Sequence, residues 1–153
     1  MVKQLPLRIN AAHKSDVRSQ FAALCYKKVK GELKILLITS RRSGRWVVPK
    51  GWPMDNKTPA KTAAQEAWEE AGVIGDATDR CLGVFSYSKT GIHPNELPCM
   101  VMVYPVRIKS LAADYPEKSQ RRRKWFSPDK AAAKVAEPEL ARILRDFDPR
   151  VLR

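Results

Sequence analysis

The sequence is poor in the two side chains that most often hold disulfides and zinc. Its 153 residues include three cysteines and two histidines. Cys25, Cys81 and Cys99 lie in apolar runs without metal-ligand spacing, which is typical of buried free thiols in a reducing compartment. His13 and His93 show no ligand spacing either, and we assign them no role. The composition therefore argues against a disulfide framework and against a zinc site.

Acidic residues are also scarce relative to basic ones. The chain has 16 Asp and Glu against 29 Lys and Arg, which gives a formal net charge of +13 and a pI of about 10.0. A field of this sign favours a polyanionic partner: nucleic acid, an anionic membrane surface or a small phosphate-rich metabolite. The charge alone does not choose among them. With 44% hydrophobic residues, the chain is long enough for one well-buried domain, which we place at residues 1–153.

Long hydrophobic runs are missing. No stretch approaches the uninterrupted apolar length of a membrane span. The first ten residues contain neither the apolar core nor the cleavage site of a secretory signal. We therefore expect a soluble, cytoplasmic protein with no membrane partner. The sequence predicts no particular oligomeric state.

Short apolar runs alternate with helical patterns along the chain. Runs at 21–29 and 34–40 flank Lys30-Gly31-Glu32 and predict a hairpin. Further strands are expected at 45–49, 81–87, 100–108 and 124–127, and helices at 58–72, 127–135 and 138–147. This order is typical of an α/β (α+β) protein whose sheet is covered on both faces. The polar segments 90–98 and 112–120 are the expected substrate-contacting loops.

The most informative element is the helix at 58–72. Thr58 fits its N-cap, and Gly72 fits its C-terminal cap. Glu66, Glu69 and Glu70 follow at spacings i, i+3 and i+4, so they crowd onto one side of the helix. Like charges at this spacing repel, and hard divalent ions such as Mg²⁺ take oxygen ligands of this kind. A solvated acidic face is the alternative, which the loop at 51–56 and the clear helix start and stop make less favourable.

Gly51, Glu66, Glu69, Glu70 and Gly72 with Val73 resemble the Nudix box, a long motif with fixed offsets. The resemblance implies the Nudix fold, an α/β/α sandwich with a mixed sheet between helices. It also implies hydrolysis of a diphosphate linked to another moiety. Thr39-Ser-Arg-Arg42 followed by Trp46-Val-Val-Pro49 resembles the diphosphoinositol-polyphosphate and dinucleoside-polyphosphate hydrolase branch of that family.

The resemblance also implies roles for the acids. Glu66 and Glu70 are the expected direct ligands of Mg²⁺ or Mn²⁺, and Glu69 is a further ligand or the base that orients water. The carbonyl of Gly51 is a further expected ligand, so the catalytic set is Glu66, Glu69 and Glu70. An acid from outside the helix often assists in this family, and Glu117 is our candidate.

Two positions depart from the box. Lys57 stands where the first Glu is expected, and Gln65 stands where an Arg is expected. In the family that Arg typically braces one of the helix acids through a charge-assisted pair, which a neutral Gln65 does not reproduce. These departures motivate an alternative function, a Nudix-fold module that binds a phosphorylated ligand without cleaving it. The retention of all three helix acids argues against this alternative.

Basic residues before the box predict the kind of substrate. Arg41, Arg42, Arg45 and Lys50 are the expected substrate-binding residues, because Arg binds two phosphate oxygens at once. A second run, 121–124, is also basic, although any single member of such a run is more often solvated surface. Together they favour a small polyphosphorylated substrate, a diphosphoinositol polyphosphate or a dinucleoside polyphosphate. RNA 5′-pyrophosphohydrolase or nucleoside triphosphate hydrolase activity is the alternative, and nucleic acid is disfavoured because no basic stripe interleaves with aromatics.

Overall fold

The computed structural model describes residues 3–6, 19–88 and 99–152. His13, His93 and the expected loop at 90–98 lie outside these residues. Strands β1 (Ser19–Val29) and β2 (Glu32–Thr39) form the predicted hairpin. It turns through Lys30 and Gly31, whose φ angles of 53° and 80° fit a tight two-residue hairpin turn.

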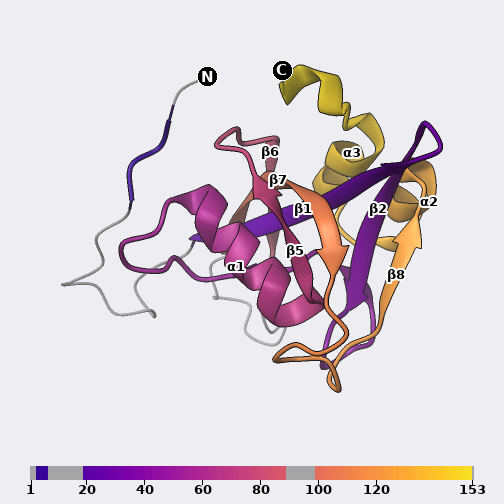
Figure 1. Cartoon of the computed structure of the whole chain (residues 1–153), viewed down its shortest axis with the longest axis horizontal. Coiled ribbons are helices and arrows are strands. Elements are labelled where there is room, and N and C mark those ends of the chain that lie inside the picture. Colours follow the sequence, from indigo (N-terminus) through magenta and orange to yellow (C-terminus); the bar gives the residue numbers. More distant parts are fainter. Residues whose placement is uncertain (1–2, 7–18, 89–98, 153) are drawn as a thin grey trace.

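The remaining elements follow in chain order (Figure 1). They are β3 (Trp46–Val47), β4 (Lys50–Gly51), α1 (Pro59–Ala71), β5 (Val73–Ala77), β6 (Gly83–Tyr87), β7 (Cys99–Leu111), β8 (Arg123–Phe126), α2 (Pro128–Lys134), α3 (Pro138–Asp146) and a 3₁₀ turn, η2 (Pro149–Leu152). Helix α1 and the two later helices lie where the sequence predicts them.

The strands form one mixed sheet. Its main path runs β3-β2-β1-β7-β5, with β4 paired to β1, β6 to β7 and β8 to β2. Strands β1 and β7 pair in parallel, and the other pairings among the described strands are antiparallel. The predicted mixed sheet is therefore confirmed.

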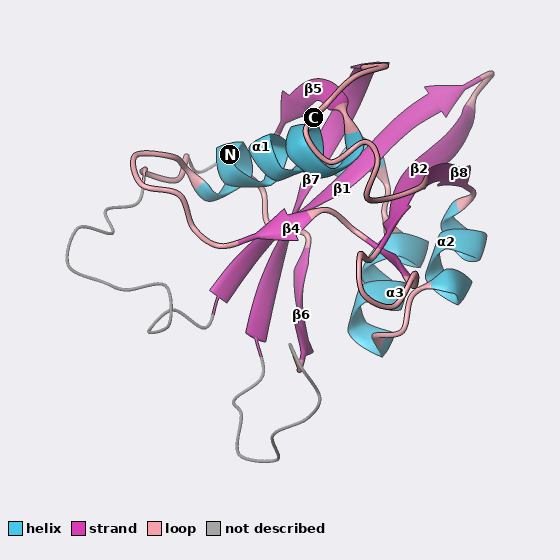
Figure 2. Cartoon of the chain, turned by 90° about the horizontal axis from the view of Figure 1, so that it is seen from below, coloured by secondary structure: helices cyan, strands magenta, loops and turns pink. Residues whose placement is uncertain are grey.

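Helices cover both faces of this sheet. Figure 2 shows α1 on one side of β1 and β7, and α2 and α3 on the other. Alternate residues of β1 serve the two layers, because successive side chains of a strand point to opposite faces. Ala23 and Cys25 pack under α1, whereas Leu24 and Tyr26 pack toward α3. The predicted α/β/α sandwich is confirmed, and burial on both faces explains the continuous apolar run.

Strands β4 and β5 were not predicted, and β6 was predicted to begin earlier than it does. Strand β5 contains Gly75 and the exposed Ile74, so it lacks the apolar pattern of a buried strand. Strand β4 is only two residues long. Strand β6 begins at Gly83 instead of Cys81, because its ladder with β7 starts at the pair Gly83 and Val103.

The cysteines are free thiols, as expected, although Cys81 is only half-buried while Cys25 and Cys99 are buried. Burial raises the pKa of the Cys25 thiol far above its ordinary value. Within the described part of the chain, no helix is both long and apolar enough to span a membrane.

Helix α1 begins and ends as the sequence predicts. The Thr58 hydroxyl accepts a hydrogen bond from the Lys61 N–H at 3.1 Å. Gly72 takes the left-handed conformation with φ of 68° and donates to the carbonyls of Ala67 and Trp68. The buried face of α1 consists largely of small residues, which lets the helix lie close to β1 and β7: Ala60, Ala63, Ala67 and Ala71.

We expect Gly72→Ala to lower the free energy of unfolding by about 2 kcal/mol, because it adds both backbone strain and a steric conflict. A Cβ at this position lies 2.5 Å from Cδ1 of Tyr115 and 2.8 Å from Nη1 of Arg123. Gly44→Ala is the matched control, since its φ of 67° is nearly the same and no atom lies within 4 Å of the added methyl. The free energy of unfolding of both variants is measured in urea. An equal loss in the two variants would show that the steric conflict at position 72 contributes nothing.

Candidate active site

The acids of α1 meet the sheet at β4. A Cβ built on Gly51 would lie 2.8 Å from Oε2 of Glu66 and would overlap the rest of that carboxylate. The Glu66 carboxylate therefore occupies the space that any side chain at position 51 needs. Gly51 pairs with Phe21 of β1, which fixes its backbone against the centre of the sheet. The structure thus brings together Gly51 and Glu66, which the sequence predicts as parts of one site.

Glu66 and Glu70 form a hydrogen-bonded carboxyl pair. Burial and the hydrogen bond to Glu70 raise the pKa of Glu66 to about 9, with further increases from the charges of Glu70, Glu69 and Glu117. Burial also raises the pKa of Glu70, although the hydrogen bond and Arg121 act in the opposite direction. Without a cation, the pair therefore keeps a proton at neutral pH, where an exposed pair of glutamates would be fully ionised.

Glu117 comes to this pair from the segment before β8. Its backbone N–H donates to the carbonyl of Glu69 at 2.9 Å, which ties the segment to α1. Its charge acts on both Glu66 and Glu70 and raises their pKa values. The structure therefore places the predicted assisting acid beside the helix acids. The segment 112–120 was predicted as a substrate-contacting loop, and at this point it is fastened to the helix.

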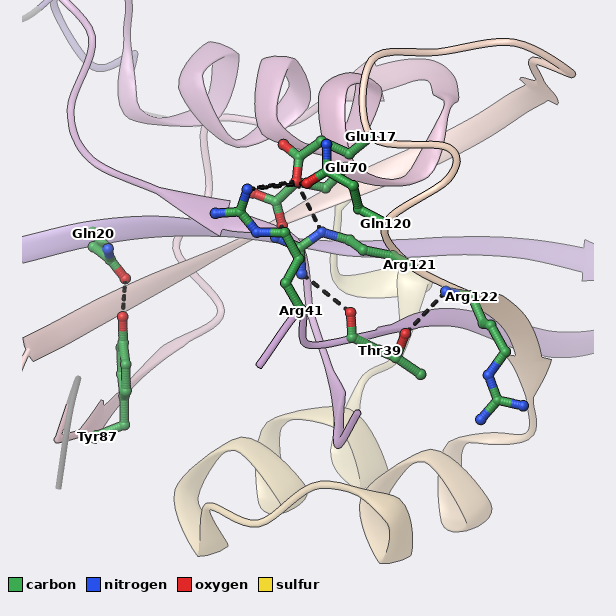
Figure 3. Close-up of polar contacts among 9 residues, drawn as sticks. All are labelled: Gln20, Thr39, Arg41, Glu70, Tyr87, Glu117, Gln120, Arg121 and Arg122. Atoms are coloured by element: carbon green, nitrogen blue, oxygen red, sulfur yellow. Dashed lines mark hydrogen bonds and ion pairs between the residues drawn. The ribbon is translucent and has the colours of Figure 1, made fainter. Parts of the chain in front are cut away.

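Arg121 is the residue of the site that the sequence did not single out. Its Nε lies 3.0 Å from Oε1 of Glu117, and its Nη2 lies 3.5 Å from Oε1 of Glu70. Its Nη1 donates to the carbonyl of Thr39 at 3.1 Å (Figure 3). The side chain is only 10% exposed. In the sequence it is one of four consecutive basic residues, and nothing in the run distinguishes Arg121 from the other three.

Glu69 lies at the edge of this group. Its carboxylate accepts a hydrogen bond from Nε2 of Gln65 at 3.3 Å, so the neutral residue at the departing box position contacts one helix acid. Glu69 is half-buried and its charge raises the pKa of Glu66. Lys57, at the other departing position, lines a separate cavity of about 360 Å³ with Gln65 and Trp68.

The four predicted substrate-binding cations are placed differently. Arg41 is exposed but close to the acids, with Nη1 at 3.1 Å from Oε1 of Gln120 and 3.9 Å from Oε1 of Glu117 (Figure 3). Arg42 is exposed, and Arg45 is exposed with its Nε bonded to Ser43 at 3.1 Å.

Lys50 lies in a less exposed environment than the three arginines. Its Nζ is 5.0 Å from the centre of the Tyr87 ring, and burial lowers its pKa. The Tyr87 hydroxyl in turn donates to Oε1 of Gln20 at 2.6 Å. Of the four cations, Arg41 therefore lies within ion-pair distance of an acid of the site, Glu117, whereas Lys50 contacts an aromatic ring.

The donor set suits a metal that completes its coordination with other oxygens. Among the described residues, no three His, Cys, Asp or Glu side chains are arranged to hold a metal by themselves. Mg²⁺ is usually bound by one or two carboxylates together with waters and substrate phosphates. Glu66 and Glu70 are such a pair, and a bound cation would take the place of the proton that their raised pKa values favour. The residues present therefore fit a divalent cation.

The raised pKa of Glu66 predicts that the metal-free protein loses stability as the pH rises. Native Glu66 binds a proton more tightly than the unfolded chain does, so its contribution is fully present below the ordinary pKa of 4.5 and is lost as pH rises toward about 9. Urea unfolding in the presence of a chelator, at several pH values across this window, measures the slope. Glu66→Gln should flatten it, and an unchanged slope in that variant would contradict the assignment.

Comparison with known proteins places this geometry in context. Residues 18–147 match the NUDIX domain. The human diphosphoinositol polyphosphate phosphohydrolase 3-alpha is 30% identical over 116 residues, covering 74% of this chain and 66% of that protein. The Arabidopsis thaliana protein named Nudix hydrolase 16, mitochondrial, is 32% identical over 110 residues, covering 69% and 60%. The chain thus spans slightly less than two thirds of these relatives' length.

Solved structures share the fold at lower identity. The Ap4A hydrolase of C. elegans superposes with a TM-score of 0.69 at 19% sequence identity, covering 88% of this chain and 98% of that one. Since the match covers most of both chains, the two proteins share the fold.

Proposed function

The chain belongs to the Nudix hydrolase family, and from this premise we propose that it is a metal-dependent pyrophosphohydrolase. It cleaves a diphosphate linkage in a small, highly anionic substrate. The observation that carries the proposal is the Glu66–Glu70 carboxyl pair, which is largely removed from solvent and in which the Glu66 carboxylate lies directly against Gly51. Keeping two such acids together without a cation costs stability, so the arrangement is best explained by a bound cation.

Glu66 and Glu70 would hold Mg²⁺ or Mn²⁺, with the Gly51 carbonyl as a further ligand. When bound, the ion supplies charge neutralisation at phosphate oxygens and lowers the pKa of water. The protein's own groups orient the reaction. Glu117 presents a carboxylate oxygen beside the pair, where it can accept a proton from the attacking water, and Glu69 is the second candidate for this role.

The proposed substrate is a diphosphoinositol polyphosphate or a dinucleoside polyphosphate. Two observations support this choice: the name of the human relative, and the excess of basic residues near the acids. Arg41 lies within 3.9 Å of the Glu117 carboxylate and is exposed, so its guanidinium is available to bind phosphate oxygens. Arg42, Arg45 and Lys50 are the further proposed substrate contacts.

A non-catalytic binding module is the second candidate, and the observation that favours it is the pair of departures at Lys57 and Gln65. A binding module has no need of a desolvated carboxyl pair, which supports hydrolysis as the first choice. Cleavage of RNA 5′ ends or of nucleoside triphosphates uses the same metal chemistry with a different leaving group.

A substrate panel with Mg²⁺ separates these candidates. The protein is incubated with diphosphoinositol polyphosphates, dinucleoside polyphosphates, nucleoside triphosphates and 5′-triphosphorylated RNA, and the products are followed by chromatography. We expect turnover to be fastest on one of the first two classes. Metal-dependent binding without turnover on any substrate would establish the binding module instead, and preference for RNA would reassign the substrate.

A further inference from the structure

We infer that Arg121 is a positioning residue that holds Glu70 and Glu117 in the geometry needed for metal binding and proton transfer. The inference deepens the proposed function and rests on it. The box position before Glu66, where a cation is expected, holds the neutral Gln65, whose hydrogen-bond partner on the helix is Glu69. Among the described residues, Arg121 is the cation within ion-pair distance of Glu70.

The guanidinium of Arg121 uses all three of its nitrogens. Nε and Nη2 contact the carboxylates of Glu117 and Glu70, which come from two different segments of the chain. Nη1 donates to the carbonyl of Thr39, at the end of β2. A planar fork with hydrogen bonds at Nε and Nη1 and an ion pair at Nη2 has little freedom to rotate, so it holds both carboxylates in position relative to β2.

The backbone that carries Arg121 is fixed as well. At the next residue, the Arg122 N–H donates to the Thr39 hydroxyl at 2.9 Å, and the Arg122 carbonyl accepts from the Thr39 N–H at 3.0 Å (Figure 3). On the other side, the Glu117 N–H is bonded to the carbonyl of Glu69. The segment is therefore secured to β2 at one end and to α1 at the other, and Arg121 joins the two inside the site.

The charge of Arg121 has a different role from those of the exposed arginines. Its side chain is 10% exposed, whereas that of Arg41 is 59% exposed. Both of its carboxylate partners belong to the proposed site, so its charge is already largely balanced before substrate arrives. A residue in this position acts on phosphate through the acids that it orients. It is thus a positioning residue, and its removal should change metal binding and turnover before substrate affinity.

Arg121→Gln tests the inference, with Arg122→Gln as the matched control. Arg122 is exposed, and its guanidinium lies 5.5 Å from the Trp46 ring, so its replacement removes the same charge from the same segment without touching the acids. We expect Arg121→Gln to weaken Mn²⁺ binding, measured by calorimetry, by about 10- to 100-fold, as when an outer-shell partner of a metal ligand is lost. We also expect kcat to fall with little change in substrate KM.

Each other result overturns the inference. Tighter Mn²⁺ binding would mean that Arg121 acts only by charge repulsion, and a raised KM with unchanged Mn²⁺ binding would mean that it binds substrate directly. If Arg121→Gln does not fold, Arg121→Lys carries the same test, since it keeps the charge but cannot make three contacts, and equal Mn²⁺ affinity in that variant would refute the role. A wild-type protein that neither binds Mn²⁺ nor turns over any substrate refutes the proposed function itself.

Discussion

Glu70→Gln is expected to reduce turnover by about 10²-fold or more, since loss of a charged metal ligand removes several kcal/mol of charge stabilisation in the transition state. The substitution keeps the size of the side chain and its helix position. It removes the negative charge with which Glu70 can bind a cation and pair with Arg121. Steady-state rates on the best substrate of the panel, with Mg²⁺ varied, provide the measurement.

Glu32→Gln is the control for this variant. Glu32 lies at the start of β2, is largely exposed and pairs with Lys34 at 3.7 Å, so the same chemical change there should leave turnover intact. If Glu70→Gln turned over like the wild-type protein, Glu70 would not be a ligand. The folded state is checked in parallel by circular dichroism, since the buried Arg121 loses one of its partners.

Gly51→Ala is expected to have the second largest effect, a loss of about 10²-fold in turnover, because a displacement of about 1 Å at reacting groups costs this much. The new methyl group would lie 2.8 Å from Oε2 of Glu66, so the carboxylate must leave its place against the sheet. Gly51 does not have a positive φ, so the substitution adds no backbone strain. The fold should persist, and the loss should appear as weaker Mn²⁺ binding and lower kcat.

Gly31→Ala provides the comparison here, because it adds the same methyl group in open space in the turn between β1 and β2. Its turnover should match that of the wild-type protein. Full activity in Gly51→Ala would show that Glu66 is not held by its contact with β4, and the proposed ligand pair would then need to be reconsidered.

The parts of the site that share one local element could be predicted from sequence. Glu66, Glu69 and Glu70 belong to a single helix with a clear start and stop, and their relation depends only on helical geometry. The link from Gly51 to Glu66 came from the resemblance to a known motif and not from local rules. Glu117 was a correct candidate for proximity to the helix acids, although its catalytic role stays a prediction.

Arg121 shows what local patterns do not contain. Its partners lie on β2, on α1 and in its own segment, so its burial depends on how three parts of the chain meet. The same reason applies to β4 and β5, whose short sequences pair only because β1 and β7 are already beside them. Tertiary contacts, and not propensity, decide the state of such segments.

The parallel pairing of β1 with β7 has a consequence for how activity is acquired during folding. These strands are separated in the sequence by five other strands and α1, and α1 packs on both. Closing so long a stretch of chain has a high entropic cost. Contacts of this kind therefore form slowly and late in folding. Glu117 and Arg121 follow β7 in the chain, so the complete site cannot form until that closure has occurred. Recovery of hydrolysis in a refolding experiment would therefore follow the final step, and a chain shortened before β7 would have no partial activity.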